Sequence, residues 1–238
     1  MSTYQDRIVA FVDILGFKEL VKQTMNDKKP ELAKEKLTSL YNVVEYVNDF
    51  FRLSSDEIGF TGDTKVTLFS DSITISIDKA NSYGVLAIFT ALKKLQIHLT
   101  LDSILLRGGV VHGKLIHEQD IILGPALINA YNLETSSALY PRIVIDPKVM
   151  VIYARENGKR MSGLRIKHFD YHQTFSKDFD GSWYIDYFSD VVPYLHDGSK
   201  DNYFTRLNNL VAANLKSPDI GIRMKYMWMR EKLKSISP

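Results

Sequence analysis

The residues RIVAFVDILGF, from Arg7 to Phe17, set the architecture expected for the rest of the chain. Residues 7–14 form a nearly continuous apolar run rich in β-branched side chains, which is typical of a strand buried on both faces. Gly16 interrupts the run, and we expect a short helix over residues 17–25. Asp13 lies inside the apolar run, where a bound cation could offset the cost of burying its carboxylate. The alternative is a strand-end carboxylate that caps the following helix.

Apolar residues beyond this segment alternate between helical and strand spacing. The expected helices cover residues 32–53, 83–101 and 124 to about 139, and the expected strands cover residues 65–69, 72–77, 105–115 and 142–145. Two of these strands form a hairpin that turns at residues 70–71. The order predicts an α+β fold with a ferredoxin-like βαββαβ core, in which an antiparallel sheet carries helices on one face.

The last third of the chain has weaker patterns. Residues 159–182 are expected to be rich in loops, residues 183–188 to form a strand, and residues 202–216 and 219–236 to form two helices. Because no repeat and no Gly/Ser-rich linker occurs, we expect a single domain over residues 1–238. Its core would cover about 6–190 and a helical C-terminal extension about 200–238.

The composition is that of an ordinary globular protein, with 45% hydrophobic and 24% charged residues among 238. A net charge of +2 is too small to indicate a nucleic-acid partner. The absence of cysteine excludes disulfides, thiolate catalysis and Cys-ligated zinc. We see no signal peptide and no uncharged segment of membrane length, so we expect a soluble cytoplasmic protein without a membrane partner.

A second carboxylate, Asp71, lies at the predicted hairpin tip. An aspartate in a turn is usually a turn former, so its pairing with Asp13 is what suggests chemistry. If the hairpin lies beside the first strand, both carboxylates meet at one end of the sheet. Two aspartates can bridge two divalent cations, and hard oxygen ligands suit Mn²⁺ or Mg²⁺.

The turn between the first strand and the first helix is the candidate phosphate contact. Its backbone N–H groups, at Ile14, Leu15, Gly16 and Phe17, and the helix dipole would face an anion, and the glycine allows close approach. The alternative is an ordinary connection between a strand and a helix.

Four motifs, taken in order, resemble those of class III nucleotidyl cyclases over residues 7 to 149. They are FVDILGF at 11–17, LFSDS at 68–72, LRGGVVHG at 106–113 and the helix of residues 124–134 ending in AYNLE. The resemblance implies that Asp13 and Asp71 are the metal ligands, with the backbone carbonyl of Ile14 as an extra ligand. Ser70 stands where many members have glycine.

The chain also departs from the family pattern. Members commonly carry Asn four residues and Arg eight residues after the glycine that leads this helix, but here these positions are Ile128 and Asn132. Asn129 lies one place later and could serve after a one-residue shift, so Asn129 and Asn132 are the candidate catalytic residues of the helix. The adenine-reading Lys and Asp are replaced by Thr67 and Ile121.

The motifs are most similar to those of the pyrimidine cyclases of Pycsar anti-phage systems. This resemblance implies conversion of UTP or CTP, with UTP favoured, into a cyclic nucleotide that activates a separate effector protein. It also implies a homodimer with shared active sites. The helix after Gly124 follows a strand expected on the far side of the fold from the aspartates, and in class III cyclases these halves meet only across a head-to-tail dimer. The alternatives are a catalytically degenerate nucleotide-binding or interaction module and a phosphotransferase with a related two-metal palm.

Other polar residues are given structural roles. His112 and His117 are five apart on a strand and should point to opposite faces, and His168 and His172 lack a third metal ligand. Arg107 is expected to support its strand. The basic residues Lys159, Arg160, Arg165 and Lys167 either are solvated or supply a cation for a triphosphate, and the basic C-terminal helix is expected to be a solvated face.

Overall fold

The computed structural model describes residues 3–25, 28–57, 64–118, 121–163, 174–195 and 199–236. The strands are β1 (Gln5–Ile14), β2 (Lys65–Phe69), β3 (Ser72–Asp78), β4 (Leu106–Glu118), β5 (Ile121–Leu123), β6 (Ile143–Ile145), β7 (Phe175–Lys177) and β8 (Trp183–Ile185). The helices are α1 (Phe17–Thr24), α2 (Pro30–Glu57), α3 (Ser82–Leu101), α4 (Pro125–Ser137), α5 (Pro147–Gly163), α6 (Lys200–Asn214) and α7 (Ile220–Ile236), with a 3₁₀ turn at Val192–Tyr194.

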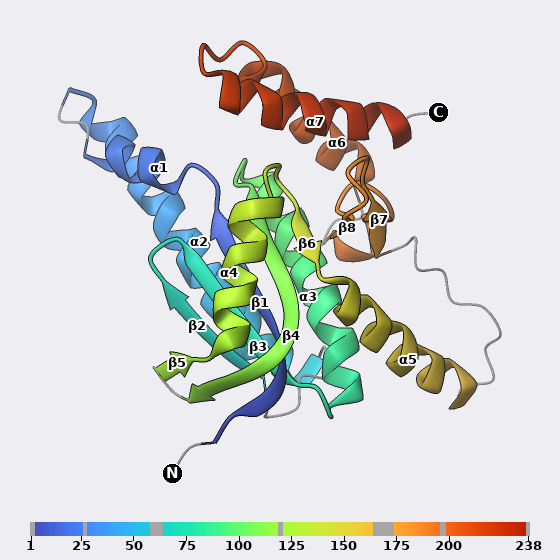
Figure 1. Cartoon of the computed structure of the whole chain (residues 1–238). Coiled ribbons are helices and arrows are strands. Elements are labelled where there is room, and N and C mark those ends of the chain that lie inside the picture. The colour runs from blue at the N-terminus through green and yellow to red at the C-terminus, as the bar shows by residue number, and fades with distance from the viewer. Residues whose placement is uncertain are drawn as a thin grey trace.

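The described strands form one sheet in the order β2-β3-β1-β4-β6-β8-β7, and β5 pairs with β4 (Figure 1). The first four strands pair antiparallel, and their order with α2 and α3 between them is the ferredoxin-like arrangement. The predicted α+β class is therefore confirmed. Beyond this core, β6 runs parallel to β4, and an antiparallel pair, β8 and β7, extends the sheet.

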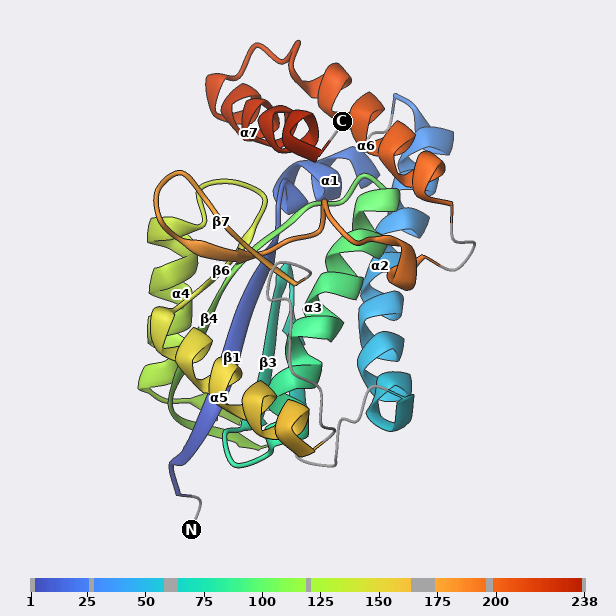
Figure 2. The same cartoon turned by 90° about the vertical axis from the view of Figure 1, so that its right-hand side faces the viewer.

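Helices lie on both faces of the sheet, whereas the sequence predicted one face. Alternate β1 residues such as Ile8 and Ala10 join the larger core with α3 and α5, while Val9 packs on the other face with α4. Figure 2 shows α4 on one side of the strands and α2 and α3 on the other. Two glycines of β4 allow this approach: a Cβ at Gly109 would lie 2.7 Å from the Ala130 carbonyl oxygen, and one at Gly113 would lie 3.2 Å from the Ala126 Cβ.

Three short or late elements differ from the sequence-based expectation. Residues 147–163 form α5, where no helix was expected. The helix begins at Pro147, a position where proline is well tolerated, and its end lies in the stretch 159–182 that was expected to be rich in loops. β5 and β7 have three residues each, too few to show a period. In the basic cluster, Arg165 and Lys167, and the side chains of Lys159 and Arg160, lie outside the described residues, as do His168 and His172.

Helix α3 is a core helix. Its segment Gly84–Leu101 is long and apolar enough to cross a membrane, with a mean hydropathy of 1.2, but 78% of it is buried inside the protein. It packs against the sheet through side chains such as Ile88, Phe89 and Leu92.

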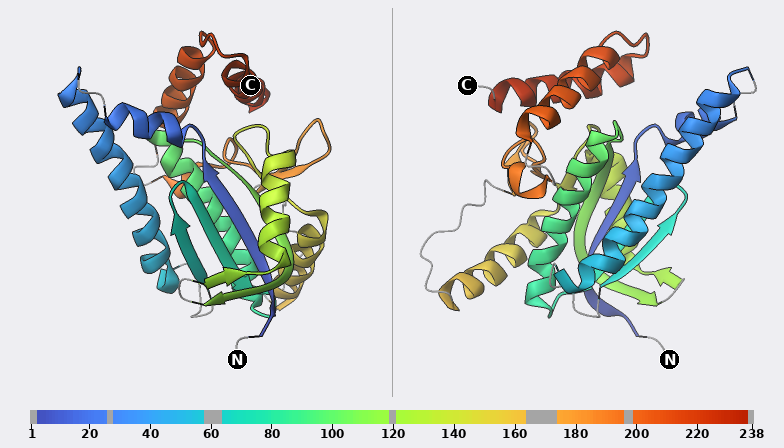
Figure 3. Two further views of the ribbon diagram at one scale, coloured as in Figure 1. Left: turned by 60° about the vertical axis from the view of Figure 1, so that its left-hand side comes forward. Right: turned by 180° about the vertical axis from the view of Figure 1, so that it is seen from behind.

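The C-terminal helices pack above the end of α3, and Figure 3 shows them beyond one end of the sheet. Tyr203 and Leu207 of α6 and Trp228 of α7 share a hydrophobic cluster with Ile97 of α3 and Tyr184 of β8. The packing accounts for the amphipathic pattern of this region. The extent of the domain, residues 1–238, remains a proposal.

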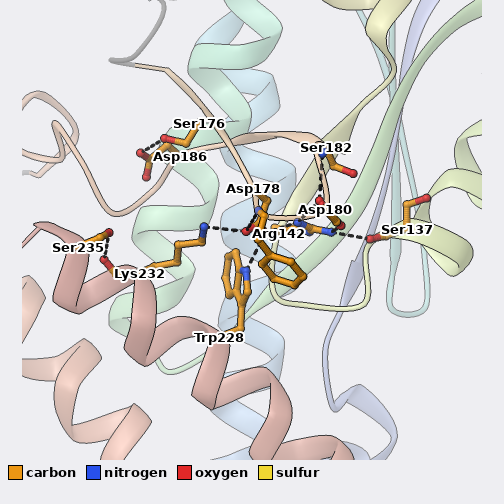
Figure 4. A network of polar contacts seen from close by, with 11 residues as sticks. Ser137, Arg142, Ser176, Asp178, Asp180, Ser182, Asp186, Trp228, Lys232 and Ser235 are labelled. Carbon is orange, nitrogen blue, oxygen red and sulfur yellow. Dashed lines mark hydrogen bonds and ion pairs between the residues drawn. The ribbon is translucent and has the colours of Figure 1, made fainter.

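A buried polar network joins α7 to the sheet (Figure 4). The carboxylate of Asp178, whose side chain is fully buried, accepts hydrogen bonds from Arg142, from the indole N–H of Trp228 at 2.7 Å and from Lys232 at 2.7 Å. Asp180 also pairs with Arg142. The carboxylates neutralise Arg142, which packing has removed from water, and Lys232, which stays partly exposed.

Candidate active site

Asp13 lies near the end of β1, on the face of the sheet that α4 partly covers. It pairs in register with Ser72 of β3 and Arg107 of β4. Its side chain is 16% exposed, and its carboxylate accepts a hydrogen bond from Arg107 Nε at 3.1 Å. Burial raises the pKa of Asp13, and the nearby Asp71 raises it further, whereas the hydrogen bond and charge of Arg107 oppose the shift.

Asp71 lies in the two-residue turn between β2 and β3, next to the end of β1. Its backbone carbonyl accepts a hydrogen bond from the Ile14 N–H at 3.0 Å, which ties the turn to the strand that carries Asp13. The preceding Ser70 has a φ of 57°, in the left-handed region that glycine adopts at the lowest cost. The hairpin therefore brings the two aspartates together at one end of the sheet, as their spacing in the sequence predicted.

A third acidic side chain, Glu134, completes the cluster through Arg107. Its carboxylate is 2.6 Å from Arg107 Nε, and its side chain is 2% exposed. Burial raises the pKa of Glu134; Arg107 lowers it, and the charges of Asp13 and Asp71 raise it. Glu134 was not predicted from the sequence as a site residue. A signal was present, because Ala126, Ala130 and Glu134 follow one another at four-residue spacing on the buried side of α4.

The carboxylates fit a divalent cation by their chemistry. Asp13 and Glu134 pair with one guanidinium, and Asp71 adds a third negative charge beside them, so the cluster has an excess of negative charge. The repulsion of Asp71 on Asp13 would be relieved by a cation between them. Among the described residues no group of three or more acidic or histidine side chains is placed to hold a metal ion. The fitting donors are thus two carboxylates and backbone oxygen, a set suited to Mn²⁺ or Mg²⁺.

The turn from β1 to α1 is only partly available to an anion. The N–H of Ile14 donates to the Asp71 carbonyl at 3.0 Å, and the N–H of Leu15 donates to the Leu105 carbonyl at 2.9 Å. These two groups are used within the fold, which corrects the expectation that the whole turn faces a phosphate. The N–H groups of Gly16 and Phe17 have no hydrogen-bond partner among the described residues, and Gly16 has a φ of 78°.

A cavity of about 400 Å³ opens on the same face, between the β2–β3 hairpin and α4. Its wall is mostly apolar, with hydroxyl groups on the strand side; the lining residues are Phe11, Thr67, Phe69, Ser72, Thr74, Ile122, Leu127, Ile128 and Tyr131. Ser72 follows Asp71 directly, so one end of the cavity begins beside the aspartates.

The candidate base and ribose contacts are distributed unevenly around this cavity. Thr67 lines it, but Ile121 does not: Ile122 faces the cavity, and Ile121 is 59% exposed. Asn129 and Asn132 are exposed on α4, and no hydrogen bond or ion pair joins them to the aspartates. The expectation that the strand before this helix lies on the far side of the fold is also wrong, because β4 pairs with β1 and α4 packs on both strands.

Solved structures of similar arrangement are adenylyl and guanylyl cyclases. The adenylyl cyclase CyaB from P. aeruginosa is 15% identical with a TM-score of 0.47, covering 78% of this chain and 96% of that protein. The monomeric guanylyl cyclase domain of the RhoGC fusion protein from Blastocladiella emersonii is 15% identical with a TM-score of 0.44, covering 77% and 95%. An adenylate/guanylate cyclase/hydrolase from Silicibacter pomeroyi is 16% identical with a TM-score of 0.41, covering 77% and 96%.

No family model and no curated protein sequence matches the chain. Sequence identities of 15–16% leave its function to be judged from the residues of the site. Those residues are the two aspartates, the Arg107–Glu134 pair that supports them, and the cavity beside them.

Proposed function

We propose that this chain is a metal-dependent nucleotidyl cyclase that converts a pyrimidine nucleoside triphosphate into a 3′,5′-cyclic nucleotide and pyrophosphate, with UTP favoured over CTP. The observation that carries the proposal is the meeting of Asp13 and Asp71 beside a cavity with apolar and hydroxyl walls, which Ser72, the neighbour of Asp71, lines. A nucleotide could place its phosphates at the carboxylates and its base in the cavity.

Asp13, Asp71 and the carbonyl of Ile14 would hold two divalent cations, Mn²⁺ or Mg²⁺. Bound there, the ions supply Lewis acidity that stabilises negative charge on the attacking and leaving oxygens. Arg107 orients the Asp13 carboxylate through its Nε, and Glu134 holds Arg107 in turn. The N–H groups of Gly16 and Phe17 would donate to phosphate oxygens.

The reaction exchanges one phosphorus–oxygen bond for another. The ribose 3′-oxygen forms a bond to the α-phosphorus and loses its proton, while the bond from the α-phosphorus to the leaving pyrophosphate breaks. The chain's contribution is to position the nucleotide. The rings of Phe11 and Tyr131 pack edge to face, with their centroids 5.6 Å apart. They form an apolar part of the cavity wall against which a base could lie.

Competition among the four ribonucleoside triphosphates tests the proposed substrate. With equal concentrations and Mn²⁺, we expect mass analysis to show cyclic UMP as the main product. Thr67 and Ile122 cannot replace the Lys and Asp that read adenine, and each unmade contact to a buried purine atom costs about 1–3 kcal/mol. A mainly purine product would overturn the pyrimidine assignment and leave the cyclase assignment in place.

One alternative has support of its own, a degenerate cyclase-like module that binds nucleotide without turnover. Helix α4 contains no arginine or lysine that could stabilise the transition state, and Asn129 and Asn132 are exposed. In the competition experiment this alternative predicts binding of UTP with no cyclic product of any base.

Exposed apolar residues on the β2–β3 hairpin and on α4 support a homodimer with shared sites. Phe69 is 80% exposed, Ile128 61% and Tyr131 51%, and all three border the cavity. Burying them against a second copy would remove this apolar surface from water. The partner's α4 would then offer Asn129 and Asn132 to the aspartates.

Mixing two inactive variants tests the shared site. Chains carrying Asp71→Ala are combined with chains carrying Asn129→Ala and Asn132→Ala, under conditions where subunits exchange. We expect about a quarter of the wild-type activity to return at equal mixing, since random pairing of protomers gives half heterodimers, each with one intact site of two. Complete absence of activity, with heterodimers detected by mass, would assign the site to a single chain.

The remaining parts of the proposal rest on the motif resemblance. The cyclic nucleotide would act as a second messenger in anti-phage defence and activate a separate effector. We propose a cytoplasmic location, with neither a membrane nor a nucleic acid as a partner.

A further inference from the structure

A chain of buried polar side chains leads from β1 to the wall of the cavity. Arg7 Nε donates to Ser76 Oγ at 2.9 Å, Ser76 Oγ contacts His117 Nδ1 at 2.8 Å, and His117 Nε2 contacts Thr67 Oγ1 at 3.0 Å. Arg7, Ser76 and His117 are 1%, 0% and 3% exposed. His117 was expected to have only a structural role, and its partners, which are 41 and 50 residues away, could not be inferred from its neighbours in the sequence.

The arginine sets the direction of the first two hydrogen bonds. A guanidinium only donates, so Ser76 Oγ accepts from it. Within the described chain, His117 Nδ1 is the other partner of this hydroxyl. A buried hydroxyl proton without an acceptor is costly, so Ser76 donates its proton to Nδ1.

The imidazole of His117 determines the direction of the third hydrogen bond, the one to Thr67. Burial, together with the charges of Arg7 and Lys65, lowers the pKa of His117 to about 4, so the ring is neutral near pH 7 and carries one N–H. Because Nδ1 accepts from Ser76, the proton is on Nε2, which donates to Thr67 Oγ1. The Thr67 hydroxyl proton is then directed away from the histidine. Thr67 lines the cavity, so that proton is available to a bound ligand.

The position of Thr67 indicates which ligand atom would accept this proton. Thr67 pairs with Thr74, which pairs with Phe11, two residues along β1 from the level of Asp13. At about 3.3 Å per residue, the level of Thr67 is therefore roughly 7 Å from the level of Asp13, counted along the strands. A nucleotide with its phosphates at Asp13 and Asp71 would present to Thr67 the base edge farthest from the sugar. In a pyrimidine that atom is the substituent at C4, which is a carbonyl oxygen in uracil and an amino group in cytosine.

We propose that Arg7, Ser76 and His117 are positioning residues that make the Thr67 hydroxyl a hydrogen-bond donor, so that the cavity selects a base with a carbonyl at C4. This deepens the function proposed above and rests on it for the placement of the nucleotide. The C4 carbonyl oxygen of uracil accepts the hydrogen bond from Thr67. The C4 amino group of cytosine would instead point its own N–H protons at the hydroxyl proton, so no hydrogen bond would form. The hydroxyl alone reads the base, and the three buried residues orient it.

The relay can be tested without any enzymatic activity. In the full-length chain labelled with ¹⁵N-histidine, the His117 resonances are assigned by their loss in His117→Gln. We expect the neutral tautomer protonated at Nε2 at pH 7. A ring protonated at Nδ1 would overturn the relay, because Thr67 would then donate to the histidine instead of to the ligand.

The selectivity for UTP over CTP tests whether the Thr67 hydroxyl contacts the base. The ratio of kcat/KM for UTP to that for CTP should fall about tenfold in Thr67→Val, which keeps the shape and removes the hydroxyl; tenfold corresponds to about 1.4 kcal/mol. Thr67→Ser should preserve the ratio. His112→Gln, on the opposite face of the same strand, is the matched control and should leave the ratio unchanged. An unchanged ratio in Thr67→Val would overturn the proposal.

The two proposals can fail separately. If no triphosphate gives a cyclic product, the cyclase function fails, and the same comparison is made as binding of UTP and CTP, followed through the His117 resonances. Preferential UTP binding that Thr67→Val removes would still support the reading of the C4 carbonyl. Equal binding of UTP and CTP by the wild-type chain would overturn it.

Discussion

Asp13→Ala and Asp71→Ala are each expected to lower the turnover number by about a thousandfold or more, equivalent to about 4 kcal/mol of transition-state stabilisation. Each change removes one of the two carboxylates that would hold the cations. The measurement is the rate of cyclic-nucleotide formation with Mn²⁺ at saturating triphosphate. Turnover near the wild-type rate in either variant would contradict the two-metal assignment.

The fold should survive both changes. Asp71→Ala removes a like charge beside Asp13, and in Asp13→Ala the Arg107 guanidinium keeps Glu134 as its partner. Added Mn²⁺ should therefore raise the melting temperature of the wild-type chain but not that of the variants, because a ligand stabilises only the state that binds it. The matched control is Asp6→Ala, a change to an exposed aspartate on the same strand that pairs with Lys114 at 2.9 Å. It should leave both activity and the Mn²⁺ response intact.

The largest expected effect on stability is that of Asp178→Ala. This carboxylate accepts hydrogen bonds from Arg142, Trp228 and Lys232. Its loss leaves the fully buried Arg142 with Asp180 as its only acidic partner among the described residues and leaves the buried Trp228 N–H without its acceptor. Removing one partner of a buried ion pair costs about 3–5 kcal/mol. For a chain of this length we expect the melting temperature to fall by roughly 10 °C.

Asp180→Ala is the control for that experiment. Asp180 pairs with the same arginine, but its side chain is 36% exposed, so water can replace part of the lost interaction. Its variant should lose clearly less stability than Asp178→Ala. If Asp178→Ala melts within 2–3 °C of the wild type, the network does not anchor α7 as its geometry indicates.

Much of the core architecture was predictable because local patterns are strong there. The hairpin was expected at residues 65–69 and 72–77 and lies at Lys65–Phe69 and Ser72–Asp78. The alternating side chains and the polar turn of the hairpin allow only one pairing register of its strands, because a one-residue slip would turn the apolar face toward water. The same reasoning placed Asp71 beside Asp13, since a hairpin next to the first strand must end at that strand's end.

Other features were not predictable because they depend on which segments meet. Helix α5 was missed because residues 149–154 form a continuous apolar run, which shows no helical period. Ile122 lines the cavity in place of Ile121, because the short β5 pairs with β4 in a register that puts Ile122 opposite His117. A three-residue strand has no period of its own from which this could be inferred.

The sequence by itself determined the α+β core, the hairpin and the pairing of Asp13 with Asp71, because helix and strand periods and turn residues act over a few neighbouring positions. Only the tertiary structure decided that Glu134 supports the aspartates through Arg107, and that His117 connects Ser76 to Thr67. Those contacts join residues far apart in the chain, and each depends on burial that removes the alternative of a hydrogen bond to water. A polar side chain has no fixed partner until packing has excluded the solvent around it.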